Sequence, residues 1–528
     1  MDNEERIVRL AKPIKKGLLR LVFSRFFVIA LLLVVQVAVA VVAYIRFSDK
    51  FHILLYIQWA FVFVMIVFLF NSSMDASAKL TWMLIIALLP LAGALMLLFT
   101  QSNVGHRKET DFTSKQIEDT RHMLAQQENV FRRVERDGSG TDDLCKYLNL
   151  SGCFPLYDRT QVTYFPLGEN KFEAMLEELE KAKEYIFMEY FIIEEGYMWG
   201  RILDVLTRKA KEGVEIRVMY DGMCEMSTLP PDYWKLLEEQ GIHARAFSPI
   251  VALLSTHYNY RDHRKILVID GKVAFNGGVN LADEYINRIE RFGHWKDTAV
   301  MLKGPAVRSF TLMFLQMWHI RGKDPDYEKW LGEDFLRSNR GYSPVVNGYV
   351  MPYCDCPLDG YKVGEAVYMD ILNRATDYVH IMTPYLIIDD RMENAIKYAA
   401  QRGVDVKLIL PGIPDKSLAY SLAKTHYRSL IAAGVKIYEY TPGFVHAKVF
   451  VCDDIKAVVG TINLDYRSLY HHFECATYMY KTDCVADIEQ DFQQTLAVYR
   501  TVTEDTIKNE KTSYKIMGTL AKAIAPLM

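Results

Sequence analysis

The sequence predicts an α/β protein, with two pseudo-symmetric α/β/α sandwich domains packed around one cleft and preceded by a transmembrane α-helical segment. Three observations lead to this prediction. An octamer of the form His-x-Lys-x-x-x-x-Asp occurs twice, at residues 263–270 and 446–453. Apolar strand-like stretches alternate with helical ones around both copies, a pattern typical of α/β layers. The first hundred residues hold long apolar runs.

Residues around the two octamers are also similar to each other, which indicates that one domain was duplicated. This duplication predicts two successive catalytic domains. We expect a membrane segment over 1–105 with two or three hydrophobic helices, a linker over 106–150, catalytic domains over 151–335 and 336–510, and an amphipathic tail over 511–528 that could lie at the membrane interface. The matched stretches are Ala182–Ile193 with Ala375–Ile388, Gly213–Asp221 with Gly403–Pro411, and Gly241–Phe247 with Gly434–Tyr440.

Three apolar runs near the N-terminus are long enough to cross about 30 Å of hydrocarbon: Phe26–Ile45, Ile53–Phe70 and Leu80–Phe99. Basic residues do not fix the orientation. If all three runs cross and the N-terminus is cytoplasmic, eight lysines and arginines lie inside and six outside, a small difference. The side of the catalytic part therefore depends on whether two or three runs span the membrane.

Composition narrows the functional classes. The net charge of −3 does not favour nucleic acid as a partner. The eight cysteines are scattered without metal-ligand spacing, so no metal is expected. The sequence has no Gly-rich phosphate loop, so no nucleotide or other cofactor is expected either.

Each octamer has the side chains for phosphodiester chemistry. A strand places residues i and i+2 on one face, so His263 lies beside Lys265, and His446 beside Lys448. The lysine can offset charge on phosphoryl oxygens, while the imidazole attacks phosphorus or moves a proton. Two copies facing one cleft would supply one histidine for attack and one to protonate the leaving alkoxide.

The remaining motif positions have less direct roles. Asp270 and Asp453 complete the candidate catalytic set, but their odd spacing from the histidines places them on the opposite strand face, which favours structural work at the strand end. Asn280 and Asn463 each lie 17 residues past the histidine in a glycine turn. Their amides can donate to a phosphoryl oxygen.

These residues resemble the phospholipase D superfamily, whose signature is a duplicated HxKxxxxD followed by G-[GS]-x-N. The second copy departs slightly, with Thr461 in place of Gly or Ser. The likeness covers about residues 155 to 500 and is greatest to the bacterial cardiolipin synthases, whose N-terminal membrane segment the stretch Lys79–Phe99 resembles.

The resemblance implies supporting residues. An acidic residue downstream of each motif hydrogen-bonds the motif histidine, which points to Asp297 after the first copy and Glu474 after the second. Arg467 and Ser468 match the context of the second motif, and Glu189 is a plausible cleft residue.

The resemblance also implies an activity: reversible phosphatidyl transfer between two phosphatidylglycerol molecules at the bacterial cell membrane, giving cardiolipin and glycerol through a phospho-histidine. The family suggests His263 as nucleophile and His446 as acid/base, although the symmetry of the sequence does not distinguish them. A phospholipase D that releases phosphatidic acid, a membrane-anchored nuclease or other phosphodiesterase, and a non-enzymatic membrane scaffold are the alternatives.

Overall fold

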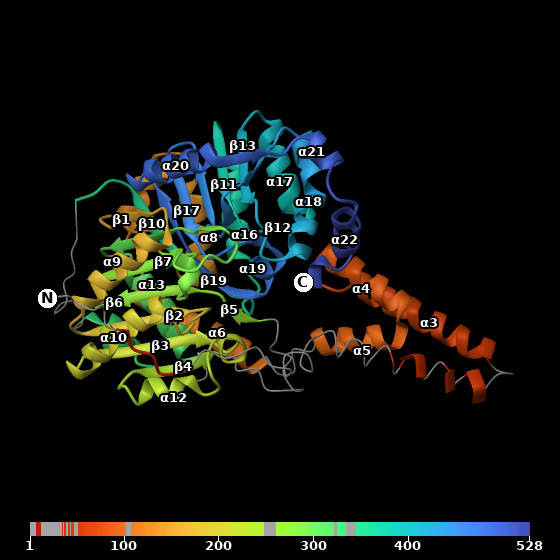
Figure 1. Ribbon diagram of the computed structural model, residues 1–528, viewed down its shortest axis with the longest axis horizontal. Coiled ribbons are helices and arrows are strands. Elements are labelled where there is room, and N and C mark those ends of the chain that lie inside the picture. The colour runs from red at the N-terminus through yellow and green to blue at the C-terminus, as the bar shows by residue number, and fades with distance from the viewer. Residues whose placement is uncertain are drawn as a thin grey trace. The chain divides into compact units, whose positions relative to one another are not determined.

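The computed structural model describes residues 7–11, several positions between 34 and 46, and residues 51–101, 107–247, 260–320, 325–333 and 345–527 (Figure 1). These residues form two compact units. The larger holds residues 7–11 and the described chain from Lys108 to Thr519, and the smaller holds the apolar helices before residue 107 and the last residues of the chain.

The first half of the larger unit is built on a seven-stranded sheet in the order β1-β9-β7-β6-β2-β3-β4. Strands β2, β3 and β4 run parallel to one another, and the remaining pairs are antiparallel. The bounds are β1 Gln161–Phe165, β2 Tyr185–Tyr190, β3 Glu215–Asp221, β4 His243–Phe247, β6 Lys265–Ile269, β7 Val273–Gly277 and β9 Ala299–Lys303.

The second half repeats this sheet strand for strand. Its order, β10-β19-β17-β16-β11-β13-β14, places each strand where its counterpart lies in the first sheet, with β20 added at the edge. The duplication read from the sequence is therefore a duplication of topology. The bounds are β10 Tyr349–Asp355, β11 Tyr378–Met382, β13 Asp405–Pro411, β14 Lys436–Tyr440, β16 Val449–Cys452, β17 Lys456–Gly460, β19 His472–Tyr480 and β20 Tyr499–Thr501.

Both faces of the first sheet are buried, because its strands are apolar at successive positions. In β2, Tyr185 and Phe187 belong to one core cluster, whereas Ile186 and Met188 belong to another, as the alternation of a strand requires. Helix α9 contacts β1 and β9, α10 contacts β3, and α12 contacts β4. Helix α13 packs on β2, β6 and β7. The helices of this half are α9 Gly168–Glu180, α10 Tyr197–Lys211, α11 Cys224–Ser227, α12 Tyr233–Glu238, η5 Asp283–Ile286, α13 Val307–Trp318 and α14 Tyr327–Leu331.

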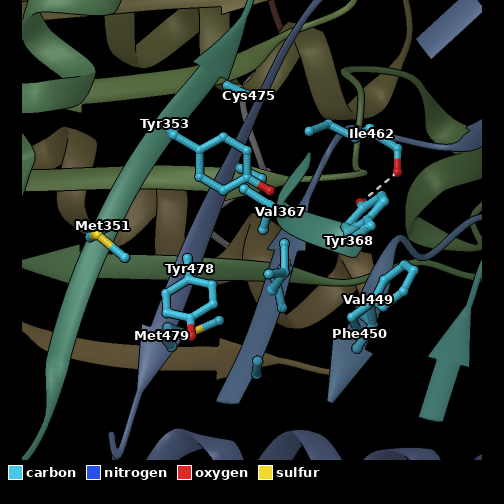
Figure 2. Close-up of a cluster of buried hydrophobic side chains, with 14 of the residues drawn as sticks. Met351, Tyr353, Val367, Tyr368, Val449, Phe450, Ile462, Cys475, Tyr478 and Met479 are labelled. Atoms are coloured by element: carbon cyan, nitrogen blue, oxygen red, sulfur yellow. Dashed lines mark hydrogen bonds between the residues drawn. The ribbon is translucent and has the colours of Figure 1, made fainter. Parts of the chain in front are cut away.

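The second sheet is covered in the same way, and Figure 2 shows part of its core. The ring of Tyr368 stacks on Phe450 with centroids 4.0 Å apart, and its hydroxyl donates to the carbonyl of Ile462 at 2.9 Å. The helices are α16 Val363–Arg374, α17 Asp390–Gln401, α18 Ser417–Ala432, α19 Tyr466–Tyr470, α20 Cys484–Thr495, η6 Leu496–Val498, α21 Glu504–Lys508, α22 Thr512–Lys522 and η7 Ala525–Leu527.

The stretch between residues 106 and 150, expected to be a linker, is mostly helical from residue 107. Its apolar side chains, among them Val130, Val134, Leu144 and Leu148, are buried in the main core. These helices therefore belong to the body of the larger unit. They are α6 Arg107–Thr120, η3 Arg121–Leu124, α7 Glu128–Arg136 and α8 Thr141–Gly152.

The smaller unit corrects the reading of the third apolar run as one membrane helix. Leu80–Phe99 is divided between α4 (Ala76–Leu88) and α5 (Pro90–Gln101), because proline has no backbone N–H and disfavours a helical residue before it. Among the described residues one helix is long and apolar enough to cross a membrane, α3 (Phe51–Phe70). Most of the run Phe26–Ile45 lies outside the described residues.

Candidate active site

Each motif histidine is held by a strand of the other half. Strand β5 (Arg261–Asp262) pairs in parallel with the start of β19, and the N–H of His263 donates to the carbonyl of Phe473 at 2.9 Å. In the same way β15 (Gly443–Val445) pairs with β8 (His294–Lys296), and the N–H of His446 donates to the carbonyl of Lys296 at 2.7 Å. The two halves thus exchange strands at the site.

The exchange corrects the predicted histidine partners. His263 Nδ1 lies 2.9 Å from both carboxylate oxygens of Glu474 in the second half, and His446 Nδ1 lies 2.6 Å from Asp297 Oδ2 in the first half. Each acid was expected to serve the histidine of its own copy. The carboxylates instead lie on or directly after β19 and β8, which pair with the strand leading into the opposite histidine. Because Nδ1 faces the carboxylate, Nε2 is the nitrogen left for chemistry.

The motif lysines lie beside their histidines, as the i, i+2 spacing predicts. Lys265 Nζ donates to the carbonyl of His263 at 2.6 Å. Lys448 Nζ donates to the carbonyl of His446 and lies 2.8 Å from its Nδ1. Burial lowers the pKa of Lys265 to about 8, and burial together with the charge of Lys265 lowers the pKa of Lys448 to about 7. The two lysines act on one another, so both motifs contribute to one electrostatic environment.

Burial also keeps both histidines neutral. Each is 7% exposed. Burial and the neighbouring lysine lower the pKa of His446 to about 4, even though Asp297 raises it. Burial, the two motif lysines and the neighbouring imidazoles of His472 and His446 lower the pKa of His263 well below its ordinary value. In the free protein at neutral pH, both imidazoles are therefore bases, and a bound phosphodiester anion would offset the lysine charges.

The two carboxylates differ. Burial opposes ionisation of Asp297, but His446 and Lys448 outweigh it and hold the pKa of that carboxyl below its usual range. Burial raises the pKa of Glu474 well above its usual range, against the opposing charge of Lys265. Asp297 accepts from the N–H of Thr298 at 2.9 Å, and Glu474 accepts from the hydroxyl of Thr461.

Asp270 and Asp453 do structural work and do not contact the histidines, which corrects their inclusion in the catalytic set. The carboxylate of Asp270 accepts the N–H groups of residues 183–185 at 2.8–2.9 Å, and that of Asp453 accepts those of residues 376–378 at the same distances. Each aspartate fastens the end of its motif strand to the start of the neighbouring antiparallel strand, β2 in the first half and β11 in the second.

The two motif asparagines differ in their hydrogen bonds. Asn280 is held by the N–H of Ile192 at 3.1 Å and donates to the hydroxyl of Tyr285 at 2.9 Å. The side-chain oxygen of Asn463 is buried and has no hydrogen-bond partner among the described residues. A phosphate-binding role for either asparagine remains a prediction.

Glu189, predicted in the cleft, is fully buried in an ion pair with Arg264 whose Nε–Oε1 distance is 2.6 Å. This buried ion pair indicates a structural role for Glu189. Arg467 is exposed, while the N–H of Ser468 donates to Asp465 at 2.8 Å.

Sequence reasoning missed the rings beside the histidines. Trp295 lies 5.4 Å from His446 and His472 lies 5.5 Å from His263, measured between ring centroids. Each precedes a histidine-binding carboxylate by two residues, and this spacing could have identified both.

One cluster has metal-binding residue types among the described residues: His263, His472 and Glu474, with donor atoms within 4.8 Å of one another. The charges of Arg467, His471 and Lys265 act on this cluster, and a positive environment opposes a cation. The cluster suits an anionic ligand better.

The chain is similar to several known proteins. Residues 175–318 and 368–496 match the family described as "Cardiolipin synthase, PLD-like domain". The chain is 31% identical over 471 residues to a cardiolipin synthase of Alkalihalophilus pseudofirmus, covering 88% of this chain and 92% of that protein. It is 57% identical over 463 residues to an uncharacterized protein of Streptococcus mutans, covering 88% and 99%. A phosphatidylserine synthase structure from Haemophilus influenzae shares the fold, with TM-score 0.54, 14% identity and coverage of 70% and 93%.

Proposed function

Because the chain belongs to the cardiolipin synthase family of phospholipase D-like phosphatidyltransferases, we propose that it joins two phosphatidylglycerol molecules into cardiolipin and releases glycerol. The observation that carries this proposal is the pair of buried histidines, each with its own lysine and carboxylate. One histidine can form a covalent phosphatidyl intermediate while the other moves the proton.

The first step forms a bond between His263 Nε2 and the phosphorus of the donor lipid. Glu474 orients the ring through Nδ1. The bond from phosphorus to the glycerol oxygen breaks, and the leaving glycerol takes a proton from His446. The ammonium groups of Lys265 and Lys448 offset the charge on the phosphoryl oxygens.

The second step reverses the roles of the lipid oxygens. A headgroup hydroxyl of another phosphatidylglycerol gives its proton to His446, and its oxygen attacks phosphorus as the bond to His263 breaks. Because one phosphodiester bond replaces another, the overall transfer is reversible and uses no nucleotide. His446 must hold a proton before the first step and is a base between the two steps. Bound phosphodiester favours that proton by offsetting the burial and the lysine charge that make His446 neutral in the free protein.

We further propose that the chain crosses the membrane twice, with the N-terminus and the catalytic domains both in the cytoplasm. Residues 7–11 pack on the first domain: Val8 N–H donates to the Gly200 carbonyl at 3.1 Å, and Leu10 N–H donates to Glu195 at 3.3 Å. A side chain at Gly200 would come within 2.4 Å of Ile7. A chain that leaves and returns to one side crosses an even number of times, and the basic residues before position 26 favour the cytoplasmic side.

A cysteine-accessibility experiment tests this topology. Single cysteines introduced at Ser48 and Ser72 flank the α3 run, and two crossings that include α3 require that an impermeant maleimide label only one of them in intact cells. A cysteine at Asn3 should stay unlabelled until the cells are opened. Labelling of Asn3→Cys in intact cells would contradict the cytoplasmic placement.

A lipid assay tests the proposed reaction. Purified wild type and His446→Ala would be given phosphatidylglycerol in liposomes with a chelator and without nucleotide, and the products identified by mass spectrometry. Cardiolipin and glycerol in equal amounts from wild type alone support the proposal. Phosphatidic acid as the sole product would make the protein a hydrolase, and cleavage of bare DNA with no lipid turnover would make it a nuclease.

A further inference from the structure

The two catalytic histidines have different ring partners at equivalent positions. Trp295 on β8 lies beside His446, with ring centroids 5.4 Å apart and planes at 46°. His472 on β19 lies beside His263, with centroids 5.5 Å apart and planes at 43°. Both come two residues before the carboxylate that binds the same histidine. At equivalent positions, the exchanged strands therefore place the indole of Trp295 beside His446 and the imidazole of His472 beside His263.

The surroundings of His446 are aromatic. Besides Trp295, the rings of Tyr285 and Phe444 lie 5.4 Å and 5.9 Å from it. Aromatic rings attract a cation placed near their faces, and tryptophan does so most strongly. The carboxylate of Asp297, 2.6 Å away, favours the same charged form. Lys448 and Lys265 oppose it until an anionic phosphodiester offsets their charge.

His263 also has one aromatic neighbour, Phe191, with ring centroids 4.9 Å apart, but the rest of its surroundings oppose a second positive charge. His472 is 8% exposed, and neither of its ring nitrogens has a hydrogen-bond partner among the described residues. Its Nδ1 lies 3.6 Å from Glu474, the carboxylate that also binds His263. Two imidazoles that share one carboxylate at this separation do not both accept a proton readily. Burial and the neighbouring Arg467 and His471 lower the pKa of His472 well below its ordinary value as well. Both rings are therefore neutral, and His472 is among the groups that disfavour a proton on His263 and keep it a base.

The groups around this pair come from every element packed against it. Lys265 on β6, Lys448 and His446 of the second motif, and Arg261 on β5 act on one or both rings, as do Arg467 and His471 at α19. Glu474 is the acidic group that contacts both. These basic groups lower the pKa of one or both rings, which adds to the effect of His472.

We propose that His472 and Trp295 are positioning residues that divide the work of the two histidines: His472 keeps His263 as the nucleophile, and Trp295 favours His446 as the proton donor. The division rests on the proposed phosphatidyl transfer. It gives a chemical reason for an asymmetry that the duplicated motifs do not contain.

Two substrates separate the roles. Bis(p-nitrophenyl) phosphate releases p-nitrophenolate, which leaves without a proton, so its burst phase reports the nucleophile alone. Phosphatidylglycerol releases glycerol, which needs a proton donor. Wild type, His472→Phe and Trp295→Leu would be compared with both substrates over a range of pH, with Trp295→Phe as the variant that keeps an aromatic ring.

We expect His472→Phe to move the acid limb of both reactions to higher pH by about one unit, because His263 then accepts a proton more readily. Trp295→Leu should slow glycerol release about tenfold and leave the p-nitrophenolate burst unchanged. Trp295→Phe should restore most of the glycerol release. A misfolded variant would lose both reactions together, and His472→Gln then provides a second test of the acid limb.

The contrary outcomes are distinct. An unmoved acid limb in both His472→Phe and His472→Gln, or a Trp295→Leu variant that slows both substrates equally, overturns the division of roles. A wild-type burst without glycerol release overturns the lipid reaction, while the His472 variants still decide the role of that residue. If wild type turns over neither substrate, both proposals fail.

Discussion

The two halves of the larger unit share the same sheet and strand-end contacts. They differ in the charge of the buried side chains near the catalytic residues. In both, an aspartate at the end of the motif strand binds three successive N–H groups. In both, a helix side chain donates to the carbonyl just before the motif asparagine. That donor is the ammonium of Lys171, 3.1 Å from Val279 O, in the first half, and the hydroxyl of Tyr368, 2.9 Å from Ile462 O, in the second (Figure 2).

The difference adds buried positive charge on the side of Asp297. Lys171 is fully buried, and burial lowers its pKa to about 7 while Asp297 acts in the opposite direction. The turn is also packed differently. A side chain at Gly278 would come within 2.0 Å of Asp297, whereas Thr461 at the equivalent position donates to Glu474. Duplication fixed the geometry of the site, and substitutions near each carboxylate made its halves chemically unequal.

Removing either histidine should have the largest effect and should break the comparison most clearly. We expect His263→Ala and His446→Ala each to lower cardiolipin formation by about 10⁴-fold, because nucleophile and proton donor act in one step. With bis(p-nitrophenyl) phosphate, His446→Ala should keep the burst and His263→Ala should lose it. Equal loss of the burst in both variants would contradict the assigned roles.

Replacing the two carboxyl groups should come next. Asp297→Asn keeps the shape of the side chain but removes the charge that orients His446, whereas Glu474→Gln replaces the buried carboxyl that binds Nδ1 of His263 with an amide. A loss of about 10³-fold in kcat is expected for each. Because the pairs are exchanged, combining Asp297→Asn with His446→Ala should cost little more than His446→Ala alone. Combining Asp297→Asn with His263→Ala tests the opposite pairing, and the two losses of kcat should multiply. If they do not multiply in this pair but do multiply in the pair with His446→Ala, the exchange is contradicted.

Replacing the buried lysine should have a smaller effect. Lys171→Met removes the charge near Asp297, so the pKa of Asp297 should rise and kcat should fall about tenfold. Tyr368→Phe is the matched control, since it removes a hydrogen bond at the equivalent carbonyl without changing charge. The control should cost about 1 kcal/mol of unfolding free energy and leave the pH profile in place. Identical pH profiles for Lys171→Met and wild type would contradict an effect of the Lys171 charge on Asp297.

The strand-end aspartates should affect stability and leave turnover per folded molecule unchanged. Asp453→Asn should cost about 2 kcal/mol of unfolding free energy, because it weakens charge-assisted bonds to three N–H groups. Burial opposes ionisation of Asp453, but these bonds hold its pKa below the usual value. The stabilisation is therefore present above the unfolded pKa and is lost as pH falls through the folded one. Urea titrations at pH 7 and pH 3 should show the difference between wild type and variant shrinking at the lower pH.

Much of the fold followed from the sequence, because strand alternation and the repeat depend on neighbouring residues. The adjacency of His263 with Lys265 and the structural role of Asp270 followed for the same reason. The exchange of Asp297 and Glu474 did not, because it depends on pairing between β5 and β19 and between β8 and β15, which no local pattern encodes. The ring partners Trp295 and His472 were missed although each lies two residues before a predicted carboxylate. That spacing was visible, but which histidine each ring faces depends on the pairing of the two halves.

The most direct test of the central claim is to locate the phosphatidyl group during turnover. Enzyme mixed with phosphatidylglycerol would be quenched in alkali, where phospho-histidine persists, digested, and sequenced by mass spectrometry. The account predicts the group on the peptide that contains His263 in wild type, and much less of it in the His446→Ala variant, which lacks the proton donor for the leaving glycerol. A group found on His446, or no covalent intermediate in either protein, would contradict it.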